Sequence, residues 1–135
     1  MANSMLRIMF DTNVLISATF NPSTAPAKSI RLAGTNCRIV LCDYVIEECR
    51  EVLKRKFPRN LELFEVLLNE SNIEIFRGNA PYSFPVPDSK DQPILDAAIA
   101  ADVDVLISGD KHFTELDIKQ PVICTPAQFL ERVEK

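Results

Sequence analysis

Five short apolar runs alternate with helix-like segments along the chain, and this alternation constrains the fold more than any other feature. The runs are mostly apolar rather than regularly alternating, and they are rich in Ile, Leu and Val. Such strands are typical of a parallel sheet that helices cover on both faces. We therefore predict an α/β fold with strands at residues 6–10, 38–42, 73–76, 104–107 and 121–124.

The helices between these strands are predicted from capping residues and apolar periodicity. Asp43 predicts an N-cap, and Gly34 predicts the end of the helix before it. Thr125, Pro126 and Gln128 predict a capping box with proline at the first helical position, so the final helix should run to the C-terminus. The predicted helices span residues 14–18, 28–33, 44–56, 61–69 and 89–101, and the last begins at residue 126.

Length and charge limit the classes of protein that fit. The chain has 135 residues, a net charge of -4 and a pI near 5.0. We expect one domain over residues 1–135. The acidic balance excludes a broad basic surface for nucleic acid but leaves room for a local basic patch. Because the sequence shows neither a signal peptide nor an apolar run of about 20 residues, we predict a cytoplasmic protein without membrane contact.

The cysteines do not predict a zinc site. Cys37, Cys42, Cys49 and Cys124 include no CxxC pair, and His112 is the single histidine. Structural zinc needs four such ligands at suitable spacing. We expect four reduced, mostly buried thiols.

Two aspartates follow predicted strands at the edge where α/β proteins bind ligands. Asp11 comes directly after residues 6–10, and Asp110 closes the turn after residues 104–107. In open α/β sheets, sites form beyond the carboxyl ends of the strands. Asp43 also follows a strand, but its capping role already accounts for it.

Helical geometry sorts the carboxylates of two helices. At about 100° per residue, Glu48 falls at the edge of the apolar stripe of residues 44–56, whereas Glu47 and Glu51 fall opposite that stripe. In residues 89–101, Asp91 falls on the apolar stripe and Asp96 on the opposite face, which we expect to be solvated. A carboxylate on a buried face needs a partner. Glu48 and Asp91 are therefore the helix carboxylates best placed to face a cleft.

Asp11, Glu48, Asp91 and Asp110 form one candidate acidic cluster, with Asp88 as the substitute if Asp91 is misplaced. Carboxylates gathered in a partly buried cleft repel one another unless protons or metal ions neutralise them. An all-oxygen ligand set suits Mg²⁺ or Mn²⁺. Such ions clamp a phosphodiester and lower the pKa of a bound water. The residues thus predict a metal-dependent phosphoryl-transfer or phosphodiester-hydrolysis site.

Five motifs follow one another along nearly the whole chain. They are residues 11–16 (DTNVLI), 45–53 (VIEECREVL), 88–95 (DSKDQPIL), 106–110 (LISGD) and 124–130 (CTPAQFL). Each motif alone is weak, but the ordered set resembles the PIN-domain ribonucleases, which have these motifs in the same order. The last motif is also similar to a bacterial and archaeal branch of that family described as toxins of toxin–antitoxin pairs.

The resemblance implies a three-layer α/β/α sandwich around a central parallel sheet of about five strands. It also implies RNA cleavage with Mg²⁺ or Mn²⁺ as cofactor. Asn13 falls on the position that orients the first aspartate of the family, and Ser108 stands where threonine is common and keeps the hydroxyl. The implied catalytic and metal-binding residues are Asp11, Glu48, Asp91 and Asp110.

A basic cluster at the end of residues 44–56 is the candidate RNA contact. Arg55 projects from the same side of its helix as Glu48, two turns on, and Lys54 precedes it. The alternative is a solvated basic face, and we hold the two interpretations equal. The cluster comprises Arg50, Lys54, Arg55, Lys56 and Arg59.

Three other residues have a functional and a structural interpretation. His112, next to the turn that holds Asp110, is expected to be a surface residue rather than a general acid. Tyr82 and Phe84 are expected to anchor the proline-rich loop of residues 77–87 rather than stack on a base.

The sequence favours a single-domain endoribonuclease in which a metal-activated water attacks the phosphodiester in line. Its expected partners are RNA and, from the resemblance, an antitoxin protein, and a homodimer is left open. A non-catalytic RNA- or protein-binding module on the same fold is the alternative. A phosphatase would need an aspartate where Asn13 stands, and a phosphoreceiver would need one after the third strand, where Arg77 stands.

Overall fold

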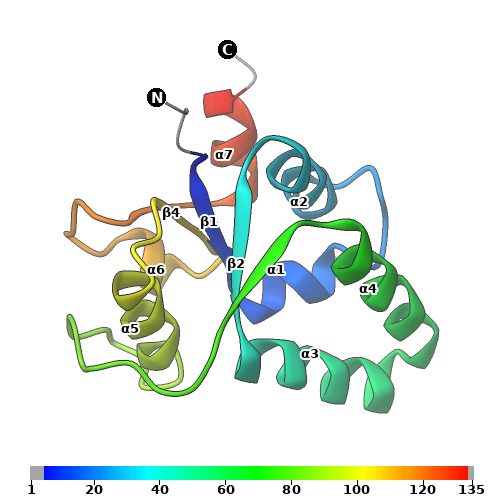
Figure 1. Cartoon of the computed structure of the whole chain (residues 1–135), viewed down its shortest axis with the longest axis horizontal. Helices are drawn as coiled ribbons and strands as arrows, with labels where there is room; N and C mark the ends of the chain where they lie inside the picture. The colour runs from blue at the N-terminus through cyan, green and yellow to red at the C-terminus, as the bar shows by residue number, and fades with distance from the viewer. Residues whose placement is uncertain (1–4, 134–135) are drawn as a thin grey trace.

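The computed structural model describes residues 5–133, which form a parallel five-stranded sheet between two layers of helices (Figure 1). The strand order is β3-β2-β1-β4-β5, and every neighbouring pair is parallel, which confirms the predicted fold. Every strand ends at the predicted residue and starts within one residue of it. The strands are β1 (Arg7–Phe10), β2 (Arg38–Cys42), β3 (Ile73–Phe76), β4 (Val105–Ile107) and β5 (Val122–Cys124).

Helices connect the strands within the described part of the chain. In Figure 1, α5 and α6 lie on one side of the sheet, and α1, α2 and α4 lie on the other. α3 begins where β2 ends, at the carboxyl edge of the sheet. The helices are α1 (Thr12–Ser17), α2 (Ala25–Asn36), α3 (Asp43–Lys56), α4 (Pro58–Glu70), α5 (Gln92–Ala100), α6 (Lys111–Thr114) and α7 (Pro126–Val133).

The prediction that Gly34 ends a helix is wrong. α2 continues to Asn36, so Gly34 lies inside it. A Cβ atom at position 34 would meet the Ser71 hydroxyl oxygen at 3.1 Å. Glycine is therefore present because α2 passes close to Ser71, rather than because the chain stops there.

Asp43 is not the N-cap that the sequence predicts. α3 begins at Asp43 itself, after Cys42, and one Asp43 oxygen accepts a hydrogen bond from the Gly78 amide at 3.1 Å. This contact ties the start of α3 to the segment that follows β3. Asp43 thus joins two parts of the fold that lie far apart in sequence.

Asp96 is buried, which corrects the prediction that it faces solvent. It is 7% exposed, and its Oδ1 accepts hydrogen bonds from the Ser83 amide, the Ser83 hydroxyl and the Gln92 side chain. The loop of residues 77–91 packs over this side of α5 and covers the carboxylate. The same packing makes α5 begin at Gln92 rather than Ser89, with Asp91 as its N-cap.

The capping box at the start of α7 is confirmed. The Gln128 amide donates to the Thr125 hydroxyl at 3.1 Å, and the Gln128 side chain accepts from the Thr125 amide at 2.9 Å. α7 is described to Val133, so its predicted continuation to the C-terminus lies outside the described residues. The cysteines are also as predicted, because all four are buried and free.

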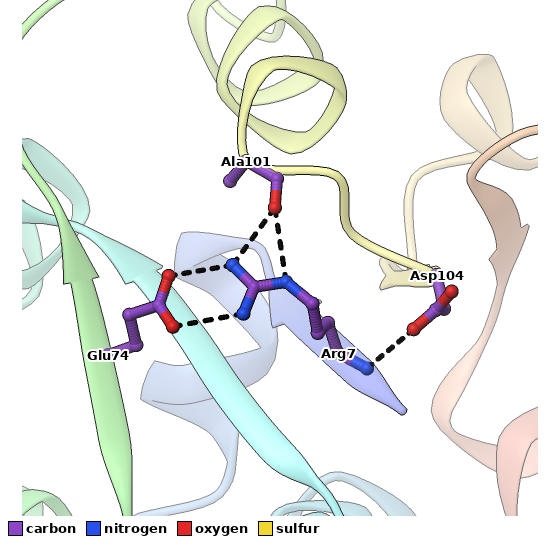
Figure 2. A network of polar contacts seen from close by, with 4 residues as sticks. All are labelled: Arg7, Glu74, Ala101 and Asp104. Atoms are coloured by element: carbon purple, nitrogen blue, oxygen red, sulfur yellow. Dashed lines mark hydrogen bonds and ion pairs between the residues drawn. The ribbon is translucent and has the colours of Figure 1, made fainter. Parts of the chain in front are cut away.

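A polar network closes the amino edge of the sheet (Figure 2). The Arg7 guanidinium donates two hydrogen bonds to Glu74, at 2.9 and 2.6 Å, and two to the Ala101 carbonyl. The Arg7 amide donates to Asp104 at 2.7 Å. Arg7 therefore links β1 to β3 and to the end of α5, so it fixes that helix against the sheet.

The opposite, carboxyl edge of the sheet brings two distant segments together. Phe10 and Ile107 are partners in the register of β1 and β4, and both are completely buried. The next residues, Asp11 and Ser108, therefore emerge side by side. Among the described residues, no helix is long and apolar enough to cross a membrane.

Candidate active site

Asp11 is held by the ends of two strands and the start of α1. Its backbone amide donates to the Ile107 carbonyl, and its Oδ1 accepts from the Val14 amide at 3.0 Å. Its Oδ2 accepts a hydrogen bond from the fully buried Ser108 hydroxyl. With 7% of its surface exposed, Asp11 has one fixed orientation.

Asp110 continues this arrangement on the same side of the sheet. Its backbone amide donates to the Ser108 hydroxyl at 3.0 Å, so Ser108 connects the two aspartates. The Asp110 carboxylate caps α6 by accepting from the His112 amide at 2.8 Å. The Asp110 carboxylate also interacts with Asp91 through hydrogen bonding.

Glu48 reaches the same cleft from α3. Its Oε1 accepts a hydrogen bond from the Thr12 hydroxyl at 2.7 Å, next to Asp11 in the chain. The hydrogen bond fixes one Glu48 oxygen and orients the side chain toward α1. The sequence placed Glu48 at the edge of its apolar stripe, and it is indeed exposed at that edge.

Asp91 completes the set from the start of α5. It is half-buried, and its side chain makes no capping hydrogen bond with that helix. All four predicted carboxylates line one cleft of about 350 Å³. Its other lining residues are Thr12, Asn13, Ile16, Val52, Lys56, Asp88, Lys90 and Ile94.

The cleft is short of positive charge. Burial raises the pKa of Asp11, and the charge of Asp110 adds to the effect, while the Ser108 and Val14 hydrogen bonds oppose it. The pKa of Asp91 rises to about 6 because of burial, hydrogen bonding with Asp110 and nearby negative charge. Both carboxylates therefore disfavour ionisation until a cation is near.

The ligand chemistry of the cleft fits a hard divalent cation. Its charged donors are carboxylate oxygens, which Mg²⁺ and Mn²⁺ prefer. The four carboxylates are spaced too widely to coordinate one ion as they lie. Among residues 5–133, no three His, Cys, Asp or Glu side chains are arranged to hold a single metal ion. The four carboxylates share a cleft, and they would have to adjust their side chains to coordinate a metal.

The supporting residues named from the sequence take different places. Ser108 contacts Asp11 directly. Asn13 lines the cleft but is exposed, and within the described residues its side chain makes no hydrogen bond to Asp11. Ser108 and the Val14 amide, rather than Asn13, therefore make the hydrogen bonds that orient Asp11.

The basic residues of the cleft differ from those singled out in the sequence. Arg55 and Lys54 are exposed on α3 but do not line the cleft, whereas Lys56 and Lys90 do. Sequence spacing alone could have indicated Lys56, which lies on the face of α3 that carries Glu48 and Val52. Lys90 could have been found only as a neighbour of Asp91.

Other candidates have structural roles or lie at the surface. Arg50 is paired with Glu47 and Glu65, at 3.0 and 2.8 Å, so its charge is already neutralised. Phe84 packs against the core and anchors its loop, as predicted. The same prediction for Tyr82 is wrong, because this side chain is 68% exposed. His112 is at the surface, as expected.

The fold and the cleft define a class of protein: a parallel α/β domain with an all-carboxylate site beyond the carboxyl ends of its central strands. A family described as PIN domain matches residues 7–112, a range that includes all four carboxylates. The chain therefore belongs to the PIN domain family, whose members are nucleases.

The structure is similar to a solved chain of VapBC2 from Rickettsia felis bound to a DNA fragment from their promoter. The TM-score is 0.63 at 17% sequence identity, over 88% of this chain and 97% of that one. At this identity, the likeness concerns the fold. No protein with a curated description matches the chain in sequence.

Proposed function

We propose that residues 1–135 form one nuclease domain that hydrolyses RNA phosphodiester bonds with Mg²⁺ or Mn²⁺. One observation carries the proposal: four carboxylates from four separate segments line a single cleft in a chain of the PIN domain family. Asp11, Glu48, Asp91 and Asp110 would hold the metal. When bound, the metal supplies an activated water and stabilises charge on the phosphate.

The residues of the chain prepare this site in different ways. Ser108 and the Val14 amide fix the two oxygens of Asp11, and Thr12 fixes one oxygen of Glu48. Asp110 accepts a hydrogen bond from α6 and also interacts with Asp91 across the cleft. Asp91 has a pKa of about 6, so its carboxylate is mostly deprotonated at neutral pH and can act as a negative ligand.

We further propose a protein antitoxin as the partner of this nuclease, in the cytoplasm. The proposal rests on the resemblance of residues 124–130 to the toxin branch of the family and on the likeness in fold to VapBC2. Co-purification of the chain with the product of an adjacent small gene would support this partner.

RNA cleavage by matched variants tests the nuclease proposal. Wild type, Asp11→Asn and the surface control Asp117→Asn are incubated with a panel of labelled single-stranded RNAs in Mn²⁺, Mg²⁺ or EDTA. We expect wild type and Asp117→Asn to cut only with metal, and Asp11→Asn to lose about 100-fold or more of the rate, because a metal ligand contributes several kcal/mol.

Two other outcomes have distinct meanings. Equal cutting by wild type and Asp11→Asn would contradict the assigned site. Absence of cutting by wild type, together with Mn²⁺ binding that Asp11→Asn loses, would favour the non-catalytic binding module. The wide spacing of the carboxylates is the observation that favours the non-catalytic binding module as the second candidate.

A further inference from the structure

Two lysines in the acidic cleft have no assigned partner. Lys56 enters from the last turn of α3, and Lys90 enters from the turn before α5. They come from two different walls, and they are the only cationic side chains among the described residues that line this cleft. Five carboxylates line the same cleft, because Asp88 joins the predicted four.

The simplest structural explanation is that the lysines neutralise these carboxylates. The contacts do not support it: among residues 5–133, neither ammonium group forms an ion pair with a carboxylate. The raised pKa of Asp91 likewise has burial and neighbouring aspartates as its causes, and no lysine among them. Both ammonium groups are therefore available to an external anion.

The backbone holds Lys90 at the cleft. Its amide donates to the Asp88 side chain at 2.9 Å, and the Asp91 amide donates to the Asp88 carbonyl at 3.0 Å. This turn keeps Lys90 beside Asp91. Lys56 lies two turns after Glu48 on the cleft side of α3, with Val52 between them.

The charge pattern indicates which anion fits. A polynucleotide places one phosphate at the carboxylates, where a divalent metal would neutralise it, and further phosphates on either side. Without the two lysines, no positive charge among the lining residues of the cleft would face those flanking phosphates. A single phosphate or carboxylate ligand would not need cations on two separate walls.

We propose that Lys56 and Lys90 bind the phosphates that flank the cleavage position of a single-stranded RNA, one on each wall of the cleft. This inference rests on the proposed nuclease function and adds the residues that position the substrate. Phosphate contacts position a strand without reading its sequence. Lys54 and Arg55 lie on the same helix but outside the cleft, and the proposal does not include them.

The test measures RNA binding apart from cleavage. Affinity for a short fluorescein-labelled single-stranded RNA is measured by fluorescence anisotropy at several KCl concentrations, with Ca²⁺ as the divalent ion. The variants are Lys56→Gln and Lys90→Gln. Lys54→Gln and Arg55→Gln are the matched controls, because they remove the same charge from the same helix turn as Lys56.

We expect each cleft variant to weaken RNA binding by about 3- to 10-fold and to reduce the salt slope by about 0.7, the value of one single-strand phosphate contact. The controls should keep the wild-type slope, and Lys56→Arg and Lys90→Arg should restore most of the affinity. Mn²⁺ affinity should not fall in any of these variants, because none removes a metal ligand.

Loss of affinity in the controls equal to that in the cleft variants would overturn the inference, as would unchanged binding by Lys56→Gln and Lys90→Gln. Absence of RNA binding by wild type would overturn it as well. Failure of the nuclease proposal looks different: wild type would bind RNA through the two lysines but not cut it with Mn²⁺ or Mg²⁺.

Discussion

The cleft concentrates negative charge on a few neighbouring carboxylates, and this lowers the stability of the folded protein when no metal is bound. Asp11 and Asp91 both have raised pKa values, which means that their ionised forms are disfavoured in the folded chain. For Asp91 the folded pKa of about 6 exceeds its ordinary value of 3.8. Its favourable contribution to stability is complete below that ordinary value and is lost as pH rises through about 6.

Asp91→Asn is therefore expected to stabilise the protein while removing its activity. At neutral pH without metal, the Tm should rise by a few degrees, because the amide relieves repulsion with Asp110 and Asp91 makes no capping hydrogen bond that would be lost. Metal-dependent RNA cleavage should fall about 100-fold or more. Thermal unfolding in EDTA and a cleavage assay measure the two effects.

Asp117→Asn serves as the control, because Asp117 is exposed and lies outside the cleft. It should change neither the Tm nor the activity. A lower Tm for Asp91→Asn at neutral pH would contradict the destabilising effect of the Asp91 charge. A Tm gain that is equally large well below the ordinary pKa of 3.8, where Asp91 is protonated in both states, would contradict it too.

At the scale of elements, α5 and the loop before it form one unit that positions Asp91. Gln92 donates to Asp96 at 2.9 Å and to the Phe84 carbonyl at 2.7 Å, and Asp96 accepts from Ser83. These hydrogen bonds hold the loop of residues 77–91 against the helix. Because the loop ends at Asp91, its order determines where that carboxylate points.

Asp96→Ala should loosen this unit. The free energy of unfolding is expected to fall by about 1–3 kcal/mol, since a buried acceptor of three hydrogen bonds is lost and its donors are left unpaired. Urea denaturation measures the change. Asp96→Asn keeps an accepting oxygen and should be clearly milder, so equal effects of the two variants would contradict the assigned role.

The elements also show which features the sequence could predict. The strands were predictable to within a residue, because a continuous apolar run in an α/β chain has few alternatives. The burial of Asp96 was not, since helical periodicity does not report tertiary contacts, and here the preceding loop of residues 77–91 folds over the polar side of α5. Gly34 was misjudged for the same reason: its neighbour Ser71 is distant in sequence.

The candidate site also contains some residues that the sequence could predict and others that it could not. Asp11 and Asp110 follow from strand ends, and Glu48 follows from helical geometry. The lysines of the cleft were missed: the spacing of Glu48, Val52 and Lys56 could have indicated Lys56, but helical geometry was applied to Arg55, and Lys90 had only its position beside Asp91 as a signal.

At the scale of the whole molecule, the two edges of the sheet have different tasks. At the amino edge, Arg7 joins β1, β3 and the end of α5 through hydrogen bonds that stabilise the fold (Figure 2). At the carboxyl edge, the polar groups are left facing a cleft. The hydrogen bonds of the amino edge and the buried core hold the elements in place. The fold therefore tolerates a cleft whose carboxylates repel one another.

The position of bound Mn²⁺ shows whether the carboxylates of the cleft form the metal site of this protein. Crystals of the wild-type protein grown or soaked with Mn²⁺ would be measured for anomalous scattering near the manganese absorption edge. We expect a peak in the cleft, coordinated by oxygens of Asp11 and Asp110 with Glu48 or Asp91, and no such peak in Asp11→Asn. A cleft without manganese, or manganese bound only elsewhere on the molecule, would contradict it.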